Sequence, residues 1–319
     1  MSARLLAAAA PAPEVPTAEA VGALLRSGEN FWLDLREPTQ EDYALLRQTF
    51  RFHELAIEDS EQFEQRPKLE DYDGFGFLVV YGWSPDEDGL VEAHCFFAEH
   101  YLVTVRRDTS PTIDALLEKL ERERGPIPAG PLLLYEVIDR LVDSFFPVVE
   151  QLNEQLDAIE ERIFASPQHE QLEEVFRLKR RLVRLRKVVV PQRDLVGRLS
   201  AGGLDLPGMS NEVQRYYRDV YDHLIRLTEE VDAGRELGHS AIAAYQSTSS
   251  NRLNVTTKQL TVIATIFLPL SFITGFFGQN FGWMVGEVSS WQAFVLLGIG
   301  LELLIVVALL TVFRKRGWF

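Results

Sequence analysis

Hydrophobic residues are distributed unevenly along the chain, and the longest apolar stretches lie near its C-terminal end. Residues 259–313 contain no lysine or arginine, and their only charged side chains are Glu287 and Glu302. The stretch divides into two apolar segments at residues 259–278 and 291–313. Each has the ~20 residues that a helix needs to cross the hydrocarbon core of a bilayer. Two such segments in succession predict a transmembrane hairpin rather than the buried helices of a soluble protein.

Basic residues flank the two predicted spans on one side only. They are Arg252, Lys258, Arg314, Lys315 and Arg316. The connecting loop, residues 279–290, contains no basic residue. The positive-inside rule therefore predicts that both ends of the chain, including the basic tail at 314–319, lie in the cytosol and the loop lies outside. We expect a multi-pass protein of the cell inner (plasma) membrane that is in contact with the lipid bilayer.

Shorter patterns precede the spans and predict a cytosolic α/β domain over residues 17–128. We expect strands at 31–36, 76–82, 93–98 and 101–106, and helices at 39–50 and 111–124. Residues 1–16 are rich in alanine and proline, and we expect a flexible tail there. Their apolar run is shorter than the ~7–15 residues of a signal peptide.

Two long helices are predicted within residues 129–207, at 132–164 and 169–199. The first is acidic near its end and the second is basic. Opposite charges suit antiparallel neighbours, although a solvated charged surface gives the same pattern.

A third helix begins near Asn211, forms a stalk over residues 208–258 and continues into the first span. Its apolar and small residues recur at steps of four and three: Val213, Tyr217, Val220, Leu224, Leu227, Val231, Gly234, Gly238, Ala241 and Tyr245. This spacing is typical of a coiled-coil seam. A helix unbroken to Gly278 would be about 100 Å long. A helix of this length cannot bury its seam alone. The seam therefore predicts a bundle, most simply a homo-oligomer whose axis continues through the membrane.

Composition narrows the classes of function. The net charge of −15 excludes a typical nucleic-acid binder and favours attraction of cations. The single cysteine, Cys95, excludes a disulfide framework. The six histidines form no metal-ligand motif, and we find no catalytic set and no Walker-type loop. We therefore expect neither an enzyme nor a resident cofactor.

One face of the first span and the adjoining stalk carries mostly small or hydroxylated residues. They are Asn254, Thr257, Thr261, Ala264, Leu268, Ser271 and Gly275. Close packing of helices uses the same residue types. The alternative is a pore lining that is wet at Asn254, Thr257 and Ser271 and dry at Leu268, where a ring of leucines would act as a hydrophobic gate. Residue types alone leave both interpretations open.

Residues 261–281, TVIATIFLPLSFITGFFGQNF, followed by a second span and RKRGWF at 314–319, resemble the CorA family of divalent cation transporters. Their central feature is Gly278-Gln279-Asn280, which matches the family's Gly-x-Asn motif at the outer end of the first span. Segments 34–72, 139–147 and 178–191 extend the resemblance over most of the chain.

The resemblance implies a funnel-shaped homopentamer whose pore is lined by the first span. It implies transport of Mg²⁺, and also of Co²⁺ or Ni²⁺, into the cytosol. Gly278, Gln279 and Asn280 would form the selectivity filter, and Asn280 would contact the hydrated ion through its waters, which Mg²⁺ releases reluctantly. Glu287 in the outer loop would attract cations. The transported ion is the expected ligand, and further copies of this chain are the expected partners.

The sequence departs from the family pattern at several positions. Gln279 stands where the magnesium channels usually have methionine, and Phe277 replaces their usual tyrosine. Ala243 aligns with a stalk aspartate that binds regulatory Mg²⁺ in well-known members, which argues for weak feedback by Mg²⁺ here. A ZntB-like zinc transporter, perhaps coupled to protons, is the alternative function.

Glu302 lies near the middle of the second span, where an ionised carboxylate is costly. Counting residues inward from the outer ends places it near the depth of Thr265 and Ser271. We predict that Glu302 faces the first span and forms a hydrogen bond with Thr265 or Ser271. It would serve either as a structural contact between helices or as a site of proton coupling.

Overall fold

The computed structural model describes residues 2–7, 16–85, 89–202 and 206–318. It divides into two compact units, which are described separately below. The first consists of Met1–Arg162 and Gln168–Ile242, and the second of Ile163–Pro167 and Ala243–Phe319.

A six-stranded mixed sheet organises the first unit, with strand order β1-β2-β6-β5-β4-β3. The strands are β1 (Ser2–Ala7), β2 (Phe31–Arg36), β3 (Lys68–Tyr72), β4 (Phe75–Ser84), β5 (Gly89–Phe97) and β6 (Tyr101–Arg106). Only the β2–β6 pair is parallel. Every residue of β4 is buried, which explains its near-continuous apolar sequence. The four predicted strands are confirmed.

The sheet is accompanied by short helices. They are α1 (Ala18–Ser27), α2 (Gln40–Leu45), the π-helical turn η1 (Leu46–Phe50), α3 (Glu54–Glu61) and α4 (Pro111–Glu123). All of them except η1 have a side-chain cap at the N-terminus. Thr39 and Asp42 form a reciprocal capping box at α2. Ser110 caps α4, and Pro111 occupies the first turn, where no backbone N–H is needed.

The prediction of a flexible tail over residues 1–16 is wrong for residues 2–7. These form β1, which pairs antiparallel with β2 and buries Leu5 and Leu6. Only the exposed edge of β2 makes this strand possible, and the alanine-rich sequence does not reveal it. The part of the predicted tail at residues 8–15 lies outside the described residues.

The helices that follow are α5 (Gly130–Asp143), α6 (Phe145–Ala165), α7 (His169–Ala201) and α8 (Asn211–Phe277). The single helix predicted at 132–164 is therefore two helices. Ser144 lies at the break, where its hydroxyl donates to the Leu141 carbonyl at 2.6 Å and accepts from the Trp83 backbone N–H at 2.7 Å. The second bond anchors the break to β4.

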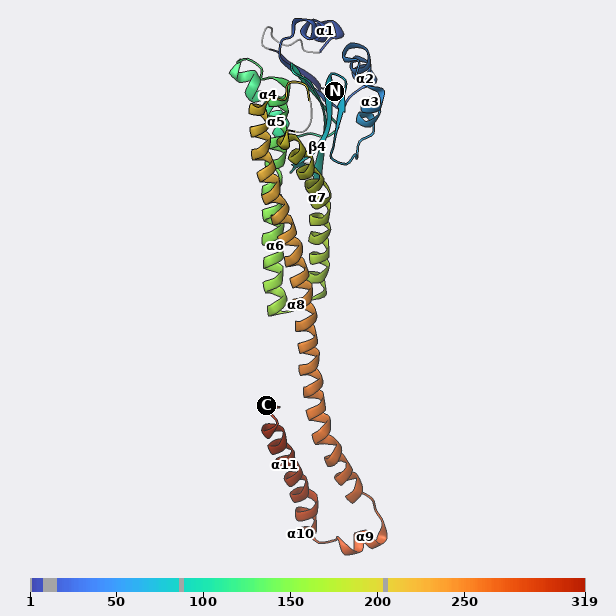
Figure 1. Ribbon diagram of the computed structural model, residues 1–319. Helices are drawn as coiled ribbons and strands as arrows, with labels where there is room; N and C mark the ends of the chain where they lie inside the picture. Colours follow the sequence, from blue (N-terminus) through green and yellow to red (C-terminus); the bar gives the residue numbers. More distant parts are fainter. Residues whose placement is uncertain (1, 8–15, 86–88, 203–205, 319) are drawn as a thin grey trace. The chain divides into compact units, whose positions relative to one another are not determined.

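The seam of α8 is buried inside the subunit, so helices of the same chain form the predicted bundle around it. Tyr217, Val220, Leu224, Leu227 and Val231 are at most 1% exposed in a single chain. A Cβ added at Gly234 would lie 2.0 Å from the Asn153 amide oxygen on α6, so the small residues of the seam admit neighbouring helices. In this unit α6 and α7 lie beside α8 (Figure 1).

A buried polar network crosses the middle of the sheet. The Arg106 guanidinium donates to both carboxylate oxygens of Asp34, at 2.8–3.3 Å, and both side chains are 1% exposed. Thr104 donates to Asp34 at 2.6 Å and accepts from the Trp32 indole N–H at 3.0 Å. Asp114 at the start of α4 accepts from Arg106 at 2.5 Å.

The second unit holds both predicted spans. Besides the C-terminal part of α8 it contains α9 (Gly282–Glu287), α10 (Trp291–Ala293), the π-helical η2 (Phe294–Gly300) and α11 (Leu301–Lys315). Among the described residues two helices are long and apolar enough to cross a membrane, α8 and the helix at Trp291–Lys315. The outer loop predicted at 279–290 includes the short helix α9.

Candidate functional site

Two opposite faces of the first span have different surroundings in a single chain. Ile273 is buried, and Val262, Ile266, Pro269 and Phe277 on the same face are partly covered. These positions recur at three- and four-residue steps, so they form one stripe along the helix. Ile273 and Phe277 line a pocket together with residues of the second span. The stripe therefore faces the chain's own second span.

The predicted pore face lies on the other side of the same helix. All seven of its members, Asn254, Thr257, Thr261, Ala264, Leu268, Ser271 and Gly275, are exposed in the single chain. Leu268 is 73% exposed, and a Cβ added at Gly275 would meet no atom within 4 Å. The structure thus brings these residues together on one continuous face that the rest of the chain leaves uncovered.

Threonine hydroxyls on this span bond to the helix itself. Thr261 donates to the Thr257 carbonyl at 2.8 Å, and Thr265 donates to the Thr261 carbonyl at 2.7 Å. Because each hydroxyl gives its proton to the backbone, its oxygen keeps lone pairs for another donor. Thr261 can therefore accept a hydrogen bond from the water shell of a cation beside the exposed face.

The Gly-x-Asn segment forms the outer end of α8. The Gly278 N–H donates to the Thr274 carbonyl at 2.9 Å, and the Gln279 N–H donates to the Phe276 carbonyl at 3.2 Å. A Cβ on Gly278 would lie 3.0 Å from the Thr274 carbonyl oxygen, a contact that glycine avoids where the helix ends. The side chains of Gln279 and Asn280 are exposed beyond this end, as is Glu287 at the end of α9.

The opposite ends of the two spans also meet. The Lys258 ammonium on α8 donates to the Gly317 carbonyl at 3.3 Å and lies 5.8 Å from the centre of the Trp318 ring. The Trp318 ring stacks on Phe313. Lysine and tryptophan at one level are typical of a membrane–water interface. This contact joins the basic flank of the first span to the basic tail.

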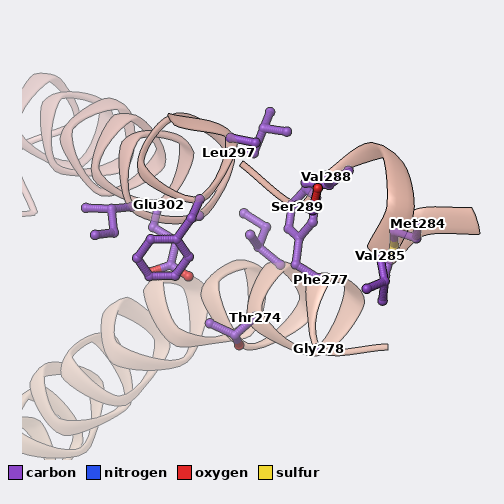
Figure 2. A pocket seen from close by; sticks show the side chains of 14 residues that line it. Thr274, Phe277, Gly278, Met284, Val285, Val288, Ser289, Leu297 and Glu302 are labelled. Carbon is purple, nitrogen blue, oxygen red and sulfur yellow. The ribbon is translucent and has the colours of Figure 1, made fainter. Parts of the chain in front are cut away.

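Glu302 faces the first span, but its neighbours differ from those predicted. It lines a pocket of about 750 Å³ with Thr274, Phe277 and Leu297 (Figure 2). Among the described residues Glu302 has no hydrogen bond to Thr265 or Ser271. Thr265 instead donates to Thr261, and Ser271 lies on the uncovered face. Counting residues from the span ends therefore misplaced the depth of Glu302 relative to the first span.

Sequence reasoning missed Thr274, which follows Ser271 by one turn and reaches the pocket. Its hydroxyl donates to the Leu270 carbonyl at 2.9 Å and to the Ser271 carbonyl at 3.1 Å. The signal that could have found it is the stripe Ile266, Pro269, Ile273 and Phe277, which marks the covered face of the helix and has Thr274 at its edge.

Together these features define a membrane protein with two C-terminal spans, a sheet-containing domain and a long stalk helix, and comparison with known proteins identifies its family. The family profile described as "CorA-like Mg2+ transporter protein" matches residues 27–315. The chain belongs to the CorA family of divalent cation transporters.

Individual relatives agree with this assignment. The chain is 35% identical over 290 residues to YfjQ of Bacillus subtilis, covering 91% of this chain and 90% of the relative. It is 32% identical to the cobalt/magnesium transport protein CorA of Thermotoga maritima, covering 84% and 77%. It is 26% identical to the zinc transport protein ZntB of Yersinia enterocolitica, covering 81% and 79%. The structure of the CorA magnesium transporter of Methanocaldococcus jannaschii shares its fold, with a TM-score of 0.83, 21% identity and coverage of 100% and 99%.

Proposed function

We propose that this protein is a channel that carries Mg²⁺, and also Co²⁺ or Ni²⁺, into the cytosol of the cell through a pore at the centre of a homopentamer. The observation that carries the proposal is the continuous uncovered face of the first span from Asn254 to Gly275, which leads to Asn280. Its own chain leaves this face of small and hydroxylated residues uncovered. Such a face can line a central axis formed together with other copies of the chain.

Asn280 is assigned the selectivity role. A ring of neutral amide oxygens accepts hydrogen bonds from the waters of a hydrated ion without removing them, and it holds the ion weakly enough for release. Gly278 and Gln279 complete the filter, and Glu287 raises the local concentration of cations. Inward movement of a dication gains about 4.6 kcal/mol per 100 mV of membrane potential, so no other energy source is needed.

Leu268 is assigned the gate. In a pentamer its side chains would form an apolar ring between the wetter levels of Thr257 and Ser271, and such a ring blocks ions by excluding water. The N-terminal unit and the basic tail lie in the cytosol in this proposal, and the loop with α9 lies outside.

Proton-coupled transport of Zn²⁺ is the second candidate. It is favoured by the similarity to ZntB proteins and by the position of Glu302 beside Thr274, in a pocket lined mainly by apolar side chains. A carboxyl group in such a place can exchange a proton during a transport cycle.

Flux through the purified protein in liposomes tests both functions. We expect uptake of Mg²⁺ that follows the membrane potential and is unchanged by a pH gradient. Uptake of Zn²⁺ without Mg²⁺, accelerated by a pH gradient, would establish the second candidate. No flux of Mg²⁺, Co²⁺, Ni²⁺ or Zn²⁺ would refute both.

The variant Asn280→Ala tests the filter. We expect flux to be abolished or to lose its ion selectivity, while the oligomer assembles as in the wild type. Gln292→Ala is a matched control, because Gln292 is an exposed amide at the start of the second span. Normal selective uptake of Mg²⁺ by Asn280→Ala would contradict the assigned role.

A further inference from the structure

Three potential metal ligands converge between α5 and α8 in the first unit, apart from the proposed ion pathway. Asp139 and Asp143 lie one helical turn apart on α5, so both face the same side. His223 reaches them from α8. Its Nδ1 atom lies 3.7 Å from an Asp139 carboxylate oxygen and 3.3 Å from an Asp143 carboxylate oxygen. One donor atom from each residue lies within 4.8 Å of the others.

Two of these donor atoms lack hydrogen bonds. The Asp139 Oδ1 and His223 Nδ1 atoms are inaccessible to solvent and have no hydrogen-bond partner among the described residues. Buried polar atoms are almost always paired. Burial, together with the neighbouring Asp143 carboxylate, raises the pKa of Asp139. A cation bound between these atoms would provide the missing partner for both atoms and would offset the cost of burying the Asp139 charge.

The spacing suits a metal ion. Bonds of about 2.0–2.2 Å place neighbouring donors about 3.0–3.5 Å apart in tetrahedral or octahedral geometry. The observed 3.3 and 3.7 Å are close to this range. Imidazole with carboxylates favours ions such as Zn²⁺, Co²⁺ and Ni²⁺, whereas Mg²⁺ prefers oxygen ligands alone. The Asp143 side chain is 54% exposed, which leaves room for water ligands.

We propose that Asp139, Asp143 and His223 form a binding site for one transition-metal dication of the Zn²⁺ class in each subunit. Two carboxylates balance the charge of the ion. The bound ion ties α5, which packs on the sheet, to the stalk helix α8.

Equilibrium dialysis of the metal-free, full-length protein in detergent against micromolar Zn²⁺ tests the site. We expect His223→Ala and Asp143→Asn each to lose one Zn²⁺ per chain, or to bind it at least tenfold more weakly. His169→Ala is a matched control and should bind as the wild type does, because His169 forms an exposed pair with Glu173 one turn away. Asn280→Ala should also keep the Zn²⁺ ion at this site. This result would distinguish the proposed site from ion binding in the pore.

Cobalt provides a second readout. Co²⁺ bound directly through nitrogen and oxygen ligands should give visible absorption bands in the wild type that are lost in His223→Ala. Asp143 is largely exposed, so Asp143→Asn tests the proposal even if the histidine variant fails to fold. Equal Zn²⁺ stoichiometry in the wild type, His223→Ala and Asp143→Asn would overturn it, as would the absence of these bands in the wild type. Neither measurement depends on transport.

Discussion

Removal of the buried Arg106 side chain should destabilise the sheet domain strongly. In Arg106→Met the apolar volume is largely kept, but the Asp34 carboxylate loses the guanidinium that now contacts both its oxygens. The Thr104 hydroxyl then remains as its hydrogen-bond donor among the described residues. Burial by itself lowers the pKa of Arg106, but Asp34 and Asp114 outweigh burial and raise it, so Arg106 is charged in the wild type.

The size of the effect follows from the burial of both partners. Each side chain is 1% exposed, so solvent cannot compensate the charge that is left behind. Removing one partner of a buried ion pair costs about 3–5 kcal/mol. For a domain of this size, 1 kcal/mol corresponds to about 2–4 °C in melting temperature, so we expect the domain to melt about 6–20 °C lower.

Thermal unfolding of the full-length protein in detergent, followed by tryptophan fluorescence, measures this shift. Trp32 and Trp83 lie in β2 and β4 and report on the sheet. Arg107→Met is the matched control, because Arg107 is the exposed neighbour of Arg106, and its melting temperature should change little.

The double variant Asp34→Leu/Arg106→Met should recover most of the loss, because it leaves no buried charge without a partner. The reasoning would be refuted if Arg106→Met melted within about 2 °C of the wild type. It would also fail if the double variant melted as low as the single one.

Three further predictions concern the membrane unit and the stalk. Leu268→Ser should raise resting flux by wetting the proposed gate, while Leu304→Ser, an exposed leucine on the second span, should not; equal flux in both variants at equal abundance would refute the gate. Glu302→Gln should preserve assembly and flux, whereas Glu302→Leu should weaken the oligomer on native gels. Loss of the response to a pH gradient in Glu302→Gln would instead indicate proton coupling, and an unaffected Glu302→Leu would exclude both roles. Because Ala243 cannot ligate a metal, millimolar Mg²⁺ should protect the stalk poorly from protease; strong protection of the wild type would contradict this, and Ala243→Asp should gain it.

Local patterns in the sequence predicted much of the secondary structure. The strands Phe31–Arg36 and Tyr101–Arg106 have the predicted bounds, and α8 runs unbroken from Asn211 to Phe277. The two spans were predicted because a lipid-facing helix must be apolar on nearly every side. The seven residues of the proposed pore face were also identified from spacing alone, because helical periodicity determines which residues share a face.

The partner of each surface was decided only by the tertiary structure. The spacing of the α8 seam predicts that it is buried, but α6 and α7 of the same chain provide packing that a second subunit could equally have supplied. Residues 2–7 form a strand because the edge of β2 is available to them. The neighbours of Glu302 depend on how the second span packs against α8.

The convergence of Asp139 and Asp143 with His223 is a further contact between elements that only the tertiary structure decided. The two aspartates are visible in the sequence as neighbours on one helix, but His223 lies far along the chain, on a different helix. Periodicity determines which side chains share a face, because it arises from the backbone geometry of one element. Contacts between elements depend on how their surfaces pack, and no local pattern carries that information.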